Sequence, residues 1–123
     1  MNELNRGVII LKPKTLLLDW VNSNSEEGGV LTLDEVSRDC TAYLTPEIED
    51  DEELREFLEQ NYDLLFEQEL VEWFQDEAQW PATRDISMFL EWFAVEFHSM
   101  VLDVAEGELF GSGGRFLTGR RRN

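Results

Sequence analysis

The order of apolar and polar positions along the chain predicts a strand, a helix and a loop at its start. Residues 7–12 are short, apolar and β-branched and end at Pro13, which is typical of a buried strand. Apolar side chains then recur at helical spacing over residues 15–23, so we expect a short helix there. Residues 22–29 are rich in Asn, Ser and Gly, which favours a loop.

A capping motif predicts the next helix. Thr32 and Glu35 have the spacing at which the threonine hydroxyl accepts from the Glu35 amide while the Glu35 carboxylate accepts from the Thr32 amide. A helix of one or two turns would follow, to about Arg38. Residues 40–44 then predict a second strand, which closes before Pro46.

The longest periodic segment follows a run of acidic residues at positions 47–53. Apolar side chains recur at steps of three and four over residues 54–74, with Glu and Asp on the other faces. Asp50 or Asp51 can cap this helix, because both precede the first apolar position. The pattern fits one long helix, or two helices with a break near Asn61.

The region after the long helix predicts one more helix and one more strand. Trp80 precedes Pro81 and therefore resists helical backbone angles. Thr83 can cap a helix whose apolar face runs to residue 93. Residues 94–104 are rich in Val, Phe, Met and Leu, and we interpret them as a third strand; the alternative is that the preceding helix continues through them.

This order of elements predicts an α+β fold with one small domain. Its three-stranded sheet would be covered on one face by four or five helices. Residues 1–6 would form a lead-in and residues 7–106 the domain. Residues 107–123, rich in Gly and Arg, would form a flexible tail.

Composition agrees with a folded single domain. The chain has 123 residues, of which 42% are hydrophobic and 11% aromatic, too many for a disordered acidic segment. Its one cysteine, Cys40, allows no intrachain disulfide, which favours a cytoplasmic location. The longest apolar run is far shorter than a membrane-spanning helix requires, so we expect no membrane association.

The charge is large and unevenly distributed. The chain has 27 acidic and 10 basic residues, a net charge of −17. Residues 1–114 have 27 acidic and six basic residues, a net charge of −21. Such a body repels phosphate, which argues against direct nucleic-acid binding by the domain. The cluster from Arg120 to Arg122 can contact a nucleic acid or an acidic partner, or simply form a solvated chain end.

His98 is the only histidine and so the main candidate for catalysis. On a strand, Glu96 would share its face and Asp103 would lie on the opposite face. A histidine near these carboxylates, or near Asp19, can act as a general base or a metal ligand. A zinc site usually needs three protein ligands, and there is no second histidine or spaced cysteine. The alternative is a histidine at a strand surface, so His98, Glu96 and Asp103 are weak candidates.

Other chemical motifs give little support for an enzyme. A nucleophilic Cys40 would need His98 as its base, and a small buried residue at the start of a strand is the simpler interpretation. The acidic run lacks the alternating ligands and the turn glycine of a calcium loop. The glycines at positions 111–114 do not join a strand to a helix, which argues against a phosphate loop. We therefore predict no cofactor and no metal.

The aromatic residues offer a more informative pattern. Four Trp, eight Phe and two Tyr are many for a chain of this length. Most can form an aromatic core. Alternatively, one or two Trp stay exposed as an anchor for a protein partner, surrounded by carboxylates. The predicted partner-binding residues are Trp80, Trp73, Glu49, Asp50, Asp51 and Glu52.

Several segments resemble a known family. Residues 80–93 and 96–103, together with residues 11–14 and 19–22, are similar to a family of small acidic bacterial proteins with no assigned activity. The resemblance covers most of residues 7–105. It implies a bacterial, cytoplasmic single domain and assigns no functional residue.

The leading hypothesis is a non-enzymatic interaction domain. Its acidic surface would bind a basic protein and mask or mimic a phosphate-binding surface. One alternative is a small hydrolase or metal-dependent enzyme centred on His98. Another is an assembly subunit that self-associates through its third strand, so the choice between monomer and homodimer stays open.

Overall fold

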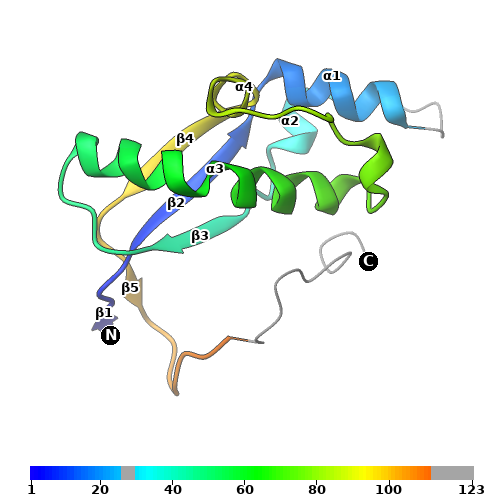
Figure 1. Ribbon diagram of the computed structural model, residues 1–123. Helices are drawn as coiled ribbons and strands as arrows, with labels where there is room; N and C mark the ends of the chain where they lie inside the picture. The colour runs from blue at the N-terminus through cyan, green and yellow to red at the C-terminus, as the bar shows by residue number, and fades with distance from the viewer. Residues whose placement is uncertain (26–29, 112–123) are drawn as a thin grey trace.

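The structure is a computed structural model that describes residues 1–25 and 30–111 (Figure 1). Within these residues, four α-helices and an antiparallel three-stranded sheet confirm the α+β fold class. The elements, in chain order, are β1 (Asn2–Glu3), β2 (Gly7–Pro13), α1 (Thr15–Asn24), α2 (Leu33–Val36), β3 (Ala42–Thr45), α3 (Asp51–Trp73), η1 (Glu77–Gln79), α4 (Ile86–Trp92), β4 (Phe93–His98) and β5 (Leu102–Asp103).

The main sheet has the order β3-β2-β4, so the predicted first strand is its centre. Val8 lies opposite Leu44 on one side and His98 on the other. Figure 1 shows the helices on one side of this sheet. Ile9 and Leu11 point to the helices and are fully buried, because alternate strand residues face opposite sides. Among the described residues, no helix covers the face that carries Val8, Leu44 and His98.

Gly7 lies in close contact with both neighbouring strands of the sheet. A Cβ atom at this position would lie 2.7 Å from Cε1 of Phe97 and 2.9 Å from Oγ1 of Thr45. Both distances are shorter than a carbon side chain tolerates. The first position of β2 therefore requires a residue without a side chain.

Aromatic side chains fill the space between the helices and the sheet. Phe66 of α3 packs against Phe89 and Phe93, with ring centroids 5.7 Å apart in both pairs. Trp20 of α1 contacts Phe74 edge to face at 5.1 Å. These geometries suit the ring quadrupoles. The aromatic core, one of the two interpretations open from sequence, therefore accounts for most of these residues.

The long helix α3 is single and unbroken. Asp50 caps it, because its side chain accepts a hydrogen bond of 2.9 Å from the Glu53 amide. The break considered near Asn61 does not occur. The Asn61 side chain donates instead to the Phe57 carbonyl at 2.8 Å, one turn back, and leaves the backbone ladder intact.

The capping box predicted at Thr32 and Glu35 is confirmed, although α2 ends at Val36. The cap predicted at Thr83 is wrong. Asp85 caps α4 instead, since its carboxylate accepts from the Met88 amide at 2.8 Å. A carboxylate two residues after the threonine was thus the better acceptor.

An arginine holds the segment before α4 in a non-helical path. The Arg84 guanidinium pairs with Asp63 and Glu67 of α3, at 2.9 Å each. It also donates to the Pro81 carbonyl at 3.1 Å. The two ion pairs fix the segment to α3 and the third bond holds the segment's own turn, so α4 begins only at Ile86.

The third strand predicted over residues 94–104 is two strands. β4 ends at His98, because beyond Phe97 no apolar side chain continues the alternation into the core. β5 pairs with β1, Asn2 opposite Asp103, in a separate two-stranded sheet. The lead-in at residues 1–6 therefore contains a strand.

Two other boundaries differ from expectation, and one prediction lies outside the described residues. α1 ends at Asn24, one residue beyond the predicted helix. β3 begins at Ala42 rather than at residue 40. Residues 107–111 form no helix or strand, and Gly107 has φ +96°. The remainder of the predicted tail, residues 112–123, lies outside the described residues.

Candidate partner-binding surface

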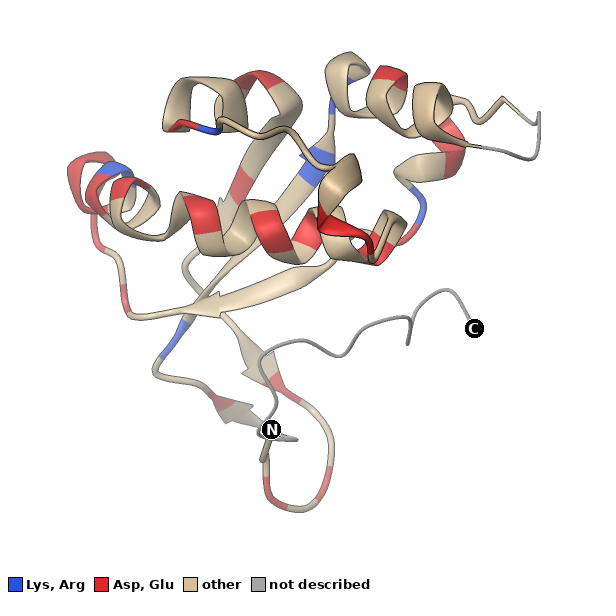
Figure 2. Cartoon of the chain, turned by 45° about the vertical axis from the view of Figure 1, so that its right-hand side comes forward, with Lys and Arg blue, Asp and Glu red and all other residues tan. Residues whose placement is uncertain are grey.

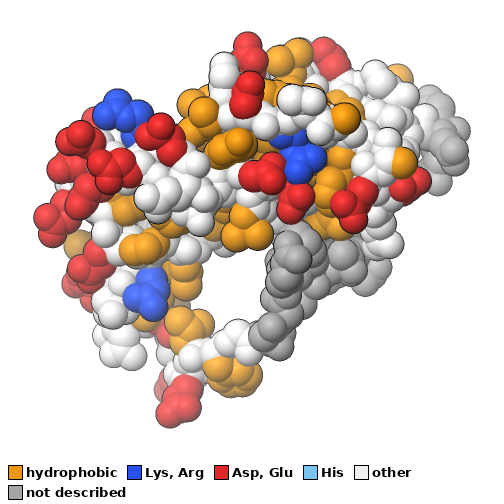
Figure 3. All heavy atoms as spheres, in the orientation of Figure 1, with side chains coloured by type: hydrophobic (Ala, Val, Ile, Leu, Met, Phe, Trp, Pro, Cys, Tyr) orange, Lys and Arg blue, Asp and Glu red, His pale blue; other side chains and the backbone are white. Residues whose placement is uncertain are grey.

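The acidic run predicted to bind a partner forms one continuous surface. It covers the loop before α3 and the first turn of that helix. Figure 2 shows red segments along this loop and the start of α3, and Figure 3 shows acidic side chains gathered at the left over the same region. Glu49, Asp50, Asp51 and Glu52 are all exposed, so the structure brings the four predicted carboxylates together.

Two carboxylates of this surface also hold the helix start. Asp50 accepts from the Glu53 amide at 2.9 Å, and Glu53 accepts in return from the Glu49 amide at 2.7 Å. These bonds satisfy backbone donors that the first turn would otherwise leave open. Negative charge is also favourable at a helix N-terminus. Asp50 and Glu53 therefore have a structural role besides any role in binding.

A hollow of about 200 Å³ opens beside these carboxylates. Its lining combines glutamates with apolar side chains, among them Ile48, which is buried. Such a hollow can accept the aliphatic stem of a lysine or arginine while the cationic head stays among carboxylates. The lining residues are Pro46, Glu47, Ile48, Glu53, Glu56, Phe57 and Gln60.

The negative charge of this surface is not compensated by ion pairs with lysine or arginine among the described residues. No lysine or arginine among the described residues forms an ion pair with Glu49, Asp51 or Glu52. Uncompensated like charges attract a cationic partner and repel one another. The described lysine and arginine ion pairs lie elsewhere, as Lys12 with Glu96, Arg38 with Asp34, and Arg84 with Asp63 and Glu67.

Acidic residues near the end of α3 behave differently. Glu69 is 7% and Glu72 5% exposed. The Tyr43 hydroxyl of β3 donates to Glu69, and the Thr41 hydroxyl donates to Glu72 at 3.2 Å. These carboxylates join the helix to the edge of the sheet, and their burial makes them unsuitable as partner contacts.

The tryptophans proposed as anchors are less exposed than the sequence suggested. Trp80 is half-buried and packs against the core, and its indole N–H donates to the Phe74 carbonyl at 2.8 Å. Trp73 is also half-buried against the core. The polar edge of Trp80 is therefore bonded inside the fold, and only part of the side chain is exposed. A partner-binding role for its remaining exposed side stays a prediction.

His98 lies on the helix-free face of the sheet. Its Nε2 is 2.7 Å from Oε2 of Glu96, which confirms that the two share a face, and Lys12 approaches the other oxygen of Glu96 at 2.8 Å. Hydrogen bonds from Lys12 and His98 lower the pKa of Glu96, and the bond with Glu96 raises the pKa of Lys12. The three side chains form an exposed hydrogen-bonded cluster.

The other proposed partners of His98 lie on different elements. Asp103 belongs to β5, and its carboxylate accepts from the Ala105 amide at 2.9 Å. Asp19 is on α1, which covers the opposite face of the sheet. The structure therefore joins His98 to Glu96 and does not add Asp19.

The second alternative, self-association through the third strand, stays a hypothesis.

Cys40 precedes β3 and is half-buried rather than fully buried. Its thiol donates to the Ser37 carbonyl at 3.5 Å, which places it at the end of the short α2 segment. Within residues 1–25 and 30–111, no three His, Cys, Asp or Glu side chains are grouped to hold a metal ion. No helix within those ranges is long and apolar enough to cross a bilayer.

No family model matches the chain, and neither a curated protein nor a solved structure matches it. The resemblance of its segments to small acidic bacterial proteins stays an expectation.

Sequence reasoning missed the apolar part of the candidate surface. Ile48 interrupts the acidic run, and Phe57 belongs to the apolar stripe of α3. Nothing in the sequence shows that these two side chains line the same hollow, because the loop must first fold back on the helix. The isolated isoleucine within the acidic run was the available signal.

Proposed function

We propose that this chain is a non-enzymatic interaction domain that binds a basic protein through the start of α3. The binding would mask the surface with which that protein holds phosphate groups. One observation carries the proposal: exposed carboxylates without a cationic partner among the described residues lie at the start of α3, beside a hollow whose lining includes Ile48 and Phe57.

The chemistry of the surface fits a lysine- or arginine-rich partner. Long-range attraction from a chain of net charge −17 would speed the encounter. Contact would then depend on the glutamates of the hollow and on Glu49, Asp51 and Glu52. The apolar side chains of the hollow would add affinity for a side chain with an aliphatic stem, and this contribution does not weaken with salt as the charge contribution does.

The test compares two variants with equal charge. The site variant replaces Glu49 by Gln, Asp51 by Asn and Glu52 by Gln, and it keeps Asp50 and Glu53 as helix-capping groups. The control variant makes the same number of neutral replacements at the exposed residues Asp19, Glu91 and Glu106. Both variants and the unmodified chain are immobilised and exposed to lysate of the source cell, and bound proteins are eluted with rising salt.

A basic protein that binds stoichiometrically to the unmodified chain and to the control, but leaves the site variant at lower salt, supports the proposal. Equal elution from the two variants would show that net charge alone retains the protein, which contradicts a specific surface. Recovery of the immobilised chain alone, or retention that does not change with salt, would also overturn the proposal.

A further inference from the structure

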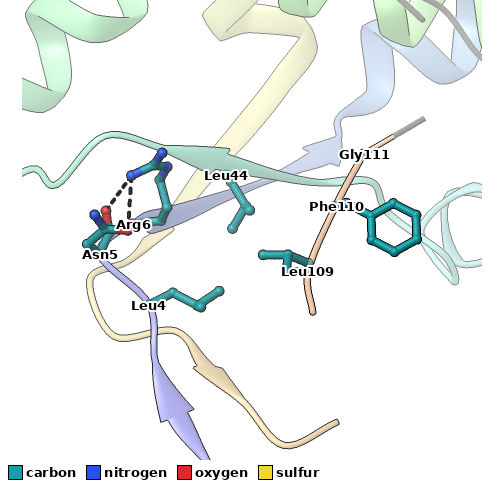
Figure 4. Close-up of a pocket in the computed structure, with 7 residues that line it drawn as sticks. All are labelled: Leu4, Asn5, Arg6, Leu44, Leu109, Phe110 and Gly111. Atoms are coloured by element: carbon teal, nitrogen blue, oxygen red, sulfur yellow. Dashed lines mark hydrogen bonds between the residues drawn. The ribbon is translucent and has the colours of Figure 1, made fainter. Parts of the chain in front are cut away.

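The helix-free face of the sheet ends in an apolar groove of about 410 Å³. It lies between segments from both ends of the described chain and the edge strand β3 (Figure 4). Its lining is mainly apolar, with one arginine at the side of the N-terminal segment. The lining residues are Leu4, Asn5, Arg6, Leu44, Leu109, Phe110 and Gly111.

The groove leaves large apolar side chains in water. Leu44 is 49% exposed, Leu109 64% and Phe110 87%. The N-terminal wall is held in place, because the Leu4 amide donates to the Val101 carbonyl at 2.8 Å next to the β1–β5 ribbon. Grouped apolar exposure at a fixed site favours a segment that covers it.

A second copy of the chain is a poor occupant. Each copy has a net charge of −17, so two domains repel each other as they approach. The chain's own residues 112–123 have the opposite character. They contain four arginines and no acidic residue, together with the apolar pair Phe116 and Leu117.

The position of this segment puts the groove within reach. Gly111 is itself part of the groove wall, and Phe116 follows five residues later. Five residues span at most about 17 Å when extended. Gly113 and Gly114 lie between them, and glycine allows the backbone angles needed to reverse direction.

We propose that the C-terminal segment docks on its own domain, with Phe116 and Leu117 packed in the groove against Leu4 and Leu44. The four arginines add attraction to the acidic body of the same chain. This intramolecular contact covers the exposed apolar side chains and holds or fails independently of any basic partner.

The first test places a spin label on the C-terminal segment of the full-length chain. The label is attached to T118C in a C40S background, so that it has a single site. NMR signals of Leu4 and Leu44 should lose intensity strongly relative to those of Leu17, which lies in the core among the helices. The loss should persist on dilution, since the contact is within one chain. Uniform broadening, or no broadening, would overturn the proposal.

The same sample tests whether a second copy of the chain occupies the groove instead. A loss that disappears on dilution would assign the groove to a second copy and contradict docking within one chain. Adding the substitutions F116S and L117S should restore the Leu4 and Leu44 signals, although neither change alters charge. Persistent broadening in that variant would show that charge alone brings the segment near, which contradicts apolar docking.

A second measurement needs no cysteine substitution. Hydrogen exchange of the β3 and Leu4–Arg6 amides is compared between the unmodified chain and the F116S/L117S variant. We expect exchange about tenfold faster in the variant at groove amides, with no change in α1. Equal exchange in the two proteins would reject the proposal even if C40S fails to fold.

Discussion

The two halves of α3 use the same kind of residue for opposite purposes. Near its start, Asp51, Glu52 and Glu56 point into water and have no hydrogen-bond partner assigned among the described residues. Near its end, Glu69 and Glu72 are buried and accept hydrogen bonds from side chains of the segment that contains β3. One half is available to another molecule, and the other half attaches the helix to the sheet.

The difference arises from what lies next to each half. The second half of α3 runs beside β3, and Thr41, Tyr43 and Gln68 supply hydroxyl and amide donors at that point. The first half projects beyond the strand, next to the acidic loop. Acidic composition alone therefore does not identify a binding surface, and the local donors decide the role of each carboxylate.

The largest loss of stability should come from a substitution on the buried face of α3, which runs along both halves of the helix. F66A removes a fully buried ring that packs against Phe89 and Phe93. We expect a loss of about 3–5 kcal/mol in the free energy of unfolding, from lost burial and the cavity left behind. Urea denaturation measures it. L64A, on the exposed side of the same helix, is the control and should change stability by less than about 1 kcal/mol. Similar losses in both variants would contradict the assigned faces.

The next effect compares the two kinds of carboxylate directly. E69A leaves the Tyr43 hydroxyl without this acceptor, so we expect a loss of about 1–3 kcal/mol. E59A removes an exposed carboxylate of the same helix and should change stability by about 0.5 kcal/mol or less. Thermal and urea unfolding of both variants provide the measurement. If E59A destabilises the chain as much as E69A, the proposed division of α3 is wrong.

A smaller effect on stability should distinguish the carboxylate that caps α3 from its neighbour, which has no capping bond. D50A removes the side chain that accepts from the Glu53 amide, and we expect a loss of about 1 kcal/mol. D51A lies one position later, has no capping bond and should leave stability nearly unchanged. Circular dichroism during urea unfolding measures both. Equal stability of the two variants would remove Asp50 from its capping role.

The smallest effect concerns Glu96, an exposed carboxylate that nevertheless has partners. The hydrogen bond from Lys12 is the main cause of the lowered pKa of Glu96. This contact therefore stabilises the fold at pH values above the ordinary pKa of a glutamate. The stabilisation is lost as the pH falls through the lowered pKa. Because the pKa of Lys12 is raised, the stabilisation that its positive charge provides is lost only when the pH rises through that raised pKa. K12M should therefore raise the pKa of Glu96 in an NMR titration. An unchanged titration would show that Lys12 does not hold Glu96.

The sequence determined the elements whose signals are local. The β-branched run before Pro13, the capping box at Thr32 and the apolar stripe of α3 each gave the correct type of element. Each depends on neighbours a few positions apart, and short-range sterics and hydrogen bonds then decide the backbone. The exposed carboxylates at residues 49–52 were also foreseeable, because so many consecutive charges cannot be buried.

The tertiary structure alone decided how distant segments meet. It split the expected third strand after His98, placed Trp80 against the core, and buried Glu69 beside Tyr43. It also brought Ile48 and Phe57 to one hollow and Leu4 and Leu44 to one groove. These contacts join residues that are far apart in the chain. Their geometry follows from the packing of the whole core, which no local pattern of apolar and polar residues contains.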